Sequence, residues 1–296
     1  MAQTPEISPA DSRKGFLLAL AAYFLWGFLP FYMKAVAHIP PVEVVAHRIL
    51  WSVPVAGLVL VWLKRTDDLK VAIRTPRMLG MAALTASIIT INWGVYVWSI
   101  GAGRALETAL GYYINPLFSV FLAFVLLGER LKPAQYAAIA LAALAVLVVT
   151  WGSGVPWVSL TLTVSWGFYA YFRKALPIGA NQGFMLEVLI LSTPALAYVI
   201  WLESTGQGHF FVSLPQSLLI MASGLVTAVP LMLYANGAKL LRLSTIGIMQ
   251  YIAPSMIFII AIFFFHEPFD MTRMIAFALI WAALVIYTIS MLRKTA

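Results

Sequence analysis

Long apolar segments, each followed by a short polar one, set the hydropathy pattern along the whole chain. A helix that crosses a bilayer needs about 20 mostly apolar residues, and ten segments meet that requirement. They are residues 16–36, 42–63, 78–99, 104–127, 133–151, 154–174, 182–202, 215–236, 243–265 and 271–292. The pattern predicts an all-α integral membrane protein with ten transmembrane helices.

The composition agrees with a membrane protein and leaves little chain for a soluble domain. Hydrophobic residues make up 62% of the 296 residues and charged residues 10%, against about 25% charged residues in soluble globular proteins. The longest polar stretches, residues 1–14 and 64–77, are too short to bury a core. Residues 1–15 are therefore expected to form a cytoplasmic tail.

Lysine and arginine side chains predict the orientation of the chain. With the N-terminus in the cytoplasm, fifteen of the 19 basic residues lie on the cytoplasmic side, and one, Arg48, lies within a span. The remaining three, Lys34, Arg104 and Arg273, lie outside. Cytoplasmic loops carry the excess of basic residues, so both termini are expected in the cytoplasm. The net charge of +8 does not indicate nucleic-acid binding, because these residues are scattered over short loops.

The second half of the sequence resembles the first at a nearly constant offset. The segment WGFLPFYMK at 26–34 matches WGFYAYFRK at 166–174, and RALETALGYYINP at 104–116 matches RLSTIGIMQYIAP at 242–254. The offsets are 140 and 138, and the second also pairs Glu129 with Glu267. We therefore expect two five-helix repeats, 16–151 and 152–292.

An odd number of spans in each half means that the two halves enter the membrane from opposite sides. The predicted architecture is a 5+5 inverted-topology repeat, which is typical of secondary transporters with a binding site near the midplane between the halves.

Several motifs show a resemblance to a known family. The inverted arrangement, the Trp-Gly start of each half and the proline-containing fourth span ending in LLGERL resemble the EamA-type transporters of the drug/metabolite transporter superfamily. Within that superfamily, AHRILWS, NWGVYVWSI, ALGYYINP, TAVPLMLY and QYIAPS resemble the RarD-like branch. The resemblance covers residues 15–292. It implies a permease of the bacterial inner membrane that exports small metabolites or amphipathic drugs, and it does not fix the substrate.

Two adjacent basic residues lie inside the second predicted span. His47 and Arg48 lie about six residues from its outer end, roughly 10 Å deep at 1.5 Å per residue. Charges inside spans are costly and usually face a cavity or a partner. Arg48 is thus a candidate to bind a substrate carboxylate or nitro-like oxygen through its fork of donors. The alternative is a structural ion pair with Glu107 or Glu43.

The repeat pairs His47 with Glu187, at an offset of 140. The two halves thus place a base and an acid at mirrored depths, and such groups can relay protons. His47 and Glu187 are therefore candidates for proton coupling. The alternative is an inert carboxyl group hydrogen-bonded to a neighbouring helix.

Aromatic and polar side chains near the middle of the spans complete the candidate binding site. Trp26 and Trp166 lie close to the midplane, whereas interfacial tryptophans lie near span ends. These rings are expected either to face the cavity or to pack in the core. The other candidates, which line a pocket or bond between helices, are Asn92, Trp93, Tyr112, Asn115, Gln250 and Tyr251.

Prolines occupy equivalent positions in the two halves. Pro54 pairs with Pro194, and Pro116 pairs with Pro254. Each removes a helix hydrogen bond and frees a carbonyl group. These four positions are candidate hinges for rocking one half against the other, with static kinks as the alternative.

The sequence excludes several other classes of function. It has no Walker A motif, no H-E-x-x-H motif and no cysteine, so ATP hydrolysis and the common metal sites are not expected. No enzymatic activity, cofactor or metal is predicted. The alternatives are an intramembrane lipid-modifying enzyme with His47 as its base, or a scaffold without transport. The expected partners are a small-molecule substrate, membrane lipids and a second copy of the chain in a homodimer.

Overall fold

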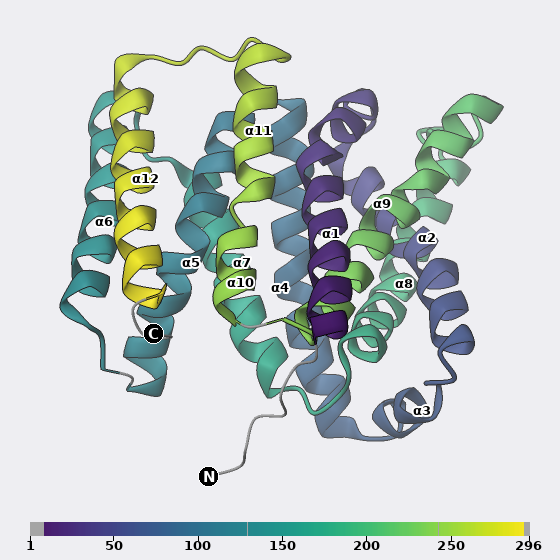
Figure 1. The fold of residues 1–296 in the computed structure, drawn as a ribbon. Coiled ribbons are helices and arrows are strands. Elements are labelled where there is room, and N and C mark those ends of the chain that lie inside the picture. The colour runs from purple at the N-terminus through teal and green to yellow at the C-terminus, as the bar shows by residue number, and fades with distance from the viewer. Residues whose placement is uncertain (1–8, 129, 242, 293–296) are drawn as a thin grey trace. The chain divides into compact units, whose positions relative to one another are not determined.

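The computed structural model describes residues 9–128, 130–241 and 243–292, and every regular element in that part of the chain is helical. Figure 1 shows these helices in chain order. They are α1 (Pro9–Ala35), α2 (Pro41–Trp62), α3 (Asp67–Ile73), α4 (Pro76–Gly101), α5 (Ala105–Leu127), α6 (Pro133–Ser153), α7 (Trp157–Ala175), α8 (Ala180–Ser204), α9 (Leu214–Ala238), α10 (Leu243–Met249), α11 (Ile252–Phe263) and α12 (Met271–Leu292).

Nine helical segments among the described residues are long and apolar enough to cross a membrane. They correspond to nine of the ten predicted spans, which confirms an all-α, multi-pass membrane protein. The exception is the predicted span 154–174, which forms helix α7 but is less apolar. Hydroxyl side chains contribute to its lower hydropathy, and two of them, Ser159 and Thr163, donate to backbone carbonyls of α5 at 2.6 and 2.9 Å. Ten membrane crossings and the inverted relation of the two halves stay predictions.

Two helix boundaries differ from the sequence-based expectation. Helix α1 begins at Pro9, so residues 9–15 of the expected tail are helical. Proline is favoured at the first position of a helix because it has no N–H to satisfy there. Residues 1–8 lie outside the described residues.

The predicted span 243–265 is also interrupted, at Gln250 and Tyr251, between α10 and α11. Pro254 explains the break, because it cannot donate to the carbonyl of Gln250 and its ring crowds that carbonyl. The repeat-equivalent Pro116 lies inside the continuous helix α5. Pro54 and Pro194 also lie inside continuous helices, α2 and α8.

The chain divides into two compact units, and each unit contains parts of both sequence halves. Unit 1 comprises residues 1–29, 38–86 and 175–253, and unit 2 comprises residues 30–37, 87–174 and 254–296. In unit 1, α2 packs against both α8 and α9. In unit 2, α6 packs against α12, as Figure 1 also shows.

Each unit is therefore built on one pair of helices that the repeat equates. α2 and α8 begin at Pro41 and Ala180, close to the offset of 140, and α6 and α12 begin at Pro133 and Met271, 138 residues apart. Small residues allow the second pair to approach closely. Ala138 and Ala142 of α6 are buried, and a Cβ on Gly152 would lie 2.6 Å from the Thr272 side chain. Ala138 and Ala142 are four residues apart on one face of α6, and small residues of this kind allow close packing of membrane helices.

Candidate functional site

Helix α2 carries a row of buried polar side chains along its first half. Glu43, His47, Arg48 and Ser52 each expose at most 3% of their surface. Residues four apart lie on one face of a helix, and this face is covered by α8 and α9 of unit 1. The residues around them in the sequence are apolar enough for α2 to span a membrane. Helix α2 therefore holds these polar groups within a mostly apolar segment.

The orientation of the Arg48 guanidinium is set by helix α9. Its Nε donates a hydrogen bond to Thr227 Oγ1 at 2.9 Å, and the Thr227 hydroxyl donates to the carbonyl of Ser223 at 2.7 Å. Thr227 itself is 3% exposed. The partner is a neutral hydroxyl group, so this contact orients the charge of Arg48 without neutralising it.

Both acids that the sequence offers as partners of Arg48 have other hydrogen bonds. Glu107 lies in unit 2 and accepts two bonds of 2.7 Å from the Arg104 guanidinium. Glu43 is fully buried, and its two carboxylate oxygens contact His209, which precedes α9. The backbone N–H of His209 donates to Oε1 at 2.7 Å, and Nδ1 of the same residue lies 2.7 Å from Oε2.

His47 lies one turn after Glu43 and is held by ring contacts. Its Nε2 is 4.0 Å from Glu43 Oε1. Neither ring nitrogen has a hydrogen-bond partner among the described residues, and the side chain is 3% exposed. The ring of Phe210 stacks on His47 with centroids 5.2 Å apart, and also on Trp51 at 5.8 Å. His47 is thus a buried base beside a buried acid, under an aromatic cover.

Glu187, the repeat partner of His47, occupies a different polar site in unit 1. It is 1% exposed, and the Thr85 hydroxyl lies 2.7 Å from its Oε1 and 3.0 Å from the carbonyl of Ala82. A hydroxyl group has only one hydrogen. It therefore bonds either to an ionised Glu187 or to the carbonyl, and in the second case a protonated Glu187 donates to Thr85. Both arrangements fit the two distances.

Three further candidate residues lie in unit 1. Trp26 is half-buried in a cluster of rings with Tyr23 and Tyr234, whose centroids are 5.7 and 5.5 Å away. Gln250 and Tyr251 form the break between α10 and α11, and Gln250 Nε2 donates to the carbonyl of Gly247 at 3.0 Å. Interrupted helices are a common feature of transporter binding sites.

The remaining candidates lie in unit 2. Asn92 connects α4 to α7, because its Nδ2 donates to the Leu162 carbonyl at 3.1 Å and to Ser165 Oγ at 2.9 Å. Asn115 is 7% exposed, and its Oδ1 has no hydrogen-bond partner among the described residues. The three aromatic candidates of this unit are Trp93, which is buried, and Tyr112 and Trp166, which are half-buried.

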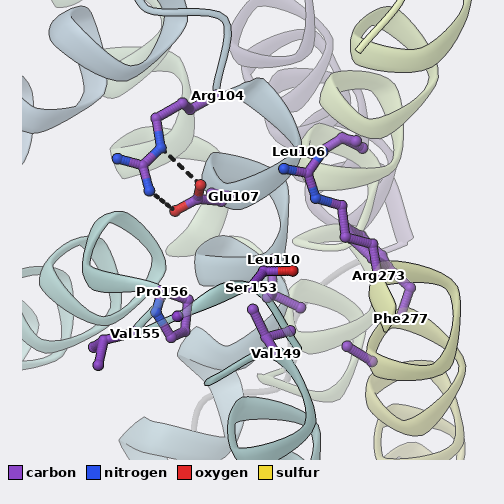
Figure 2. Close-up of a pocket in the computed structure, with 12 residues that line it drawn as sticks. Arg104, Leu106, Glu107, Leu110, Val149, Ser153, Val155, Pro156, Arg273 and Phe277 are labelled. Atoms are coloured by element: carbon purple, nitrogen blue, oxygen red, sulfur yellow. Dashed lines mark hydrogen bonds and ion pairs between the residues drawn. The ribbon is translucent and has the colours of Figure 1, made fainter. Parts of the chain in front are cut away.

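Unit 2 also contains a small cavity of about 60 Å³, shown in Figure 2. Arg104, Glu107 and Arg273 contribute its charges, and the rest of its lining comes from α5, α6, α12 and the connection between α6 and α7, and is mostly apolar. The Arg104 guanidinium also lies over the rings of Trp98 and Trp157, 5.6 and 5.1 Å from their centroids. Small-molecule sites usually measure about 300–1,000 Å³, so this cavity suits a few water molecules rather than a metabolite.

A buried carboxylate near this cavity caps the N-terminus of helix α5. Glu267, which follows α11, accepts from the backbone N–H groups of Ala105 and Leu106 at 2.6 and 2.9 Å. These are the first N–H groups of α5, which have no partner within the helix. Burial raises the pKa of Glu267 above its usual value, and the two N–H donors oppose that rise. Its repeat partner Glu129, like Arg242, lies outside the described residues.

Comparisons with known proteins identify the family. The model of the EamA-like transporter family matches residues 13–151. Protein RarD from Streptomyces exfoliatus is 41% identical over 285 residues, which cover 96% of this chain and 90% of that protein. The chain belongs to the EamA-like transporter family.

Further matches extend along nearly the whole of this EamA-like chain. An uncharacterized transporter from Vibrio cholerae serotype O1 is 38% identical over 296 residues, covering 99% of this chain and 97% of its own. A crystal structure aligns with 93% of this chain and 96% of its own at a TM-score of 0.60 and 20% identity, which shows a shared fold alone. The resemblance to RarD-like proteins predicted from sequence motifs is confirmed, and the protein is a multi-pass membrane transporter.

Several residues of this EamA-like transporter were not selected by sequence reasoning. Thr227, His209 and Phe210 lie about 160 positions or more from the α2 residues that they contact. Glu43 was considered only as a partner for Arg48. The one available signal was its spacing of four from His47, which places an acid and a base on the same helix face.

Proposed function

We propose that this transporter is a secondary permease of the bacterial inner membrane that exports small amphipathic metabolites, amino acids or drug-like compounds by alternating access. The observation that carries the proposal is the buried Arg48 guanidinium, oriented by the neutral hydroxyl of Thr227 at 2.9 Å. A guanidinium keeps its charge at any pH of interest. A substrate with a carboxylate or nitro group offers planar oxygens that match its donors.

Flux measurements in proteoliposomes test this proposal. We expect saturable movement of probes with a carboxylate or nitro group, such as phenylalanine or chloramphenicol, and much slower movement of phenylalaninamide, which lacks the anionic end. The probe should be recovered chemically unchanged. Chemical conversion of the probe would favour an intramembrane enzyme, and the absence of flux for every member of the panel would favour a scaffold.

The orientation of the chain is a separate part of the proposal. Both termini and the segment 64–77 lie in the cytoplasm, and the segment between α8 and α9 lies outside, because the basic residues favour this arrangement. The chain has no cysteine, so single cysteines can be labelled without background. A membrane-impermeant maleimide added to intact cells should modify Gln207→Cys and leave Thr66→Cys unmodified until the cells are lysed. The reverse pattern would show that the orientation is wrong.

We further propose that transport is coupled to protons. His47 and Glu187 are buried titratable groups at positions related by the repeat. The carboxyl group of Glu187 is within hydrogen-bonding distance of the Thr85 hydroxyl. Pro54, Pro116, Pro194 and Pro254 are the proposed hinges. Among them, the break beside Pro254 supplies the most freedom, because Gln250 and Tyr251 already lie outside regular helix.

A further inference from the structure

The segment between α8 and α9, residues 205–213, is fastened to the outer half of α2 through one acid. Glu43 is fully buried, and both of its oxygens contact His209 of this segment at 2.7 Å. The His209 side chain is 31% exposed. A buried carboxylate on a membrane helix is thus connected to solvent through a single imidazole.

Phe210 adds an aromatic contact to the same attachment. Its ring stacks on His47 and Trp51 of α2, at centroid distances of 5.2 and 5.8 Å. The next two residues, Phe211 and Val212, are 76% and 66% exposed. His209 and Phe210 therefore make the contacts with α2, whereas the side chains of the next two residues are exposed.

The internal bonds of the segment keep its shape but do not hold it to α2. Gln216 Nε2 donates to the carbonyl of His209 at 2.7 Å, and the Ser217 hydroxyl donates to the carbonyl of Phe210. The backbone N–H of Phe210 donates to Glu203 at 3.2 Å. These partners belong to α8 and α9, so the segment can leave α2 without losing these bonds.

The charged and titratable groups around Glu43 come from three elements. α2 contributes His47, 4.0 Å from Glu43, and Arg48; the segment contributes His209; and α8 contributes Glu203. The only titratable side chain in the sequence of helix α9 is that of Tyr234. The groups that can change their protonation state around this attachment are therefore two carboxyl groups, those of Glu43 and Glu203, and two imidazoles.

We propose that Glu43, His209 and His47 form a proton-binding site, and that proton uptake by Glu43 releases the segment 205–213 from α2. An ionised carboxylate accepts strong, charge-assisted hydrogen bonds from both donors of His209. When a proton binds to a carboxylate oxygen, the negative charge disappears and both bonds weaken. A proton on His209 alone would instead add positive charge beside the ionised carboxylate and strengthen this contact, so the release follows the proton that binds to Glu43.

The role of this site in transport rests on the proposed function. In that role, proton binding on the outer side of the membrane is the event that opens the path outward. The site itself can be tested without any substrate. Val212→Cys provides an exposed position on the segment, and a spin label there reports the mobility of the segment in lipid nanodiscs.

The full-length protein carrying the label is examined between about pH 3 and 8, a range that includes the unperturbed pKa values of both glutamate and histidine. We expect label mobility to increase at the acid end of this range, where Glu43 takes up its proton. Glu43→Gln imitates the protonated acid, so its label should be mobile at every pH. Glu187→Gln removes another buried acid of the same unit that contacts Thr85 instead, and it should respond to pH as the parent does.

A second variant keeps the test decisive if Glu43→Gln fails to fold. His209→Ala alters a partly exposed side chain and removes one donor to the carboxylate while keeping the backbone N–H. Its release midpoint should move to higher pH by about one unit or more, because a lost charge-assisted bond corresponds to about tenfold or more in proton affinity.

The proposal is overturned if the parent label shows no change with pH, if Glu43→Gln responds like the parent, or if Glu187→Gln alone removes the response. Absence of substrate flux in proteoliposomes, with the label response intact, would instead contradict the proposed transport function and leave the proton site standing.

Discussion

Replacing Arg48 with alanine should abolish saturable transport while the protein still reaches the membrane in normal amounts. The guanidinium is 3% exposed within α2, and its charge is the feature that the proposed substrate binds. Removing it also removes a costly charge from the span, so the folded protein should tolerate the change. Transport should fall to the rate of liposomes without protein.

Two milder variants separate the charge of Arg48 from its geometry. Arg48→Lys keeps the charge but loses the planar fork of donors, so the KM for a carboxylate substrate should rise. Thr227→Val is nearly isosteric and removes the hydroxyl that accepts from Nε, whereas Thr227→Ser retains it. We expect weakened transport for Thr227→Val and near-normal transport for Thr227→Ser.

Initial rates in proteoliposomes, normalised to the amount of reconstituted protein, measure these effects. Normal transport by Arg48→Ala would refute the role of Arg48 as the anchor. Equal losses for Thr227→Val and Thr227→Ser would show that the hydroxyl contact does not position the guanidinium.

Gly224→Ala should strongly destabilise unit 1. A Cβ at Gly224 would lie 2.1 Å from the carbonyl oxygen of Trp51 and 2.2 Å from its carbonyl carbon. These are backbone atoms of α2, so α2 and α9 would have to separate. Overpacking of this kind costs about 1–3 kcal/mol or more. Gly224 lies three residues before Thr227, and Trp51 lies three residues after Arg48, so transport should fall as well.

Gly57→Ala is the matched control, because it makes the same chemical change on α2. The nearest atom to its added Cβ would be the Met185 methyl group at 3.7 Å, an ordinary contact. Thermal unfolding in detergent should show a melting temperature several degrees lower for Gly224→Ala, and an unchanged or higher one for Gly57→Ala, since alanine favours helix by about 1 kcal/mol. Similar melting temperatures for the two variants would contradict the close approach of α2 and α9.

The helices of this protein and its identity as a membrane protein could be predicted from local features of the sequence. A bilayer fixes the length of an apolar segment, and a spanning segment must satisfy its backbone hydrogen bonds internally. Nine of the ten predicted spans follow from these constraints. The tenth, α7, is less apolar because it contains hydroxyl residues such as Ser159 and Thr163, and only the tertiary structure shows that these two hydroxyl groups bond to α5.

The burial of His47 and Arg48 could also be predicted, because a charge within a span has few places to go. Their partners could not. Thr227 is 179 residues from Arg48, and His209 is 166 residues from Glu43, so no local pattern relates them. Likewise, the break at Gln250 could be anticipated from Pro254, whereas the equivalent Pro116 lies in a continuous helix.

The sequence by itself thus determined which long segments are helical, that His47 and Arg48 are buried and to which family the motifs belong, because each depends on short-range chemistry. Only the tertiary structure decided that α2 packs with α8 and α9, and that each compact unit draws on both halves of the repeat. It also decided that Glu43 binds His209 of the segment 205–213. These features depend on which helix faces meet. Most faces in a membrane protein are similarly apolar, so the choice among them is made by a few close contacts, such as Gly224 against Trp51, that hydropathy cannot distinguish.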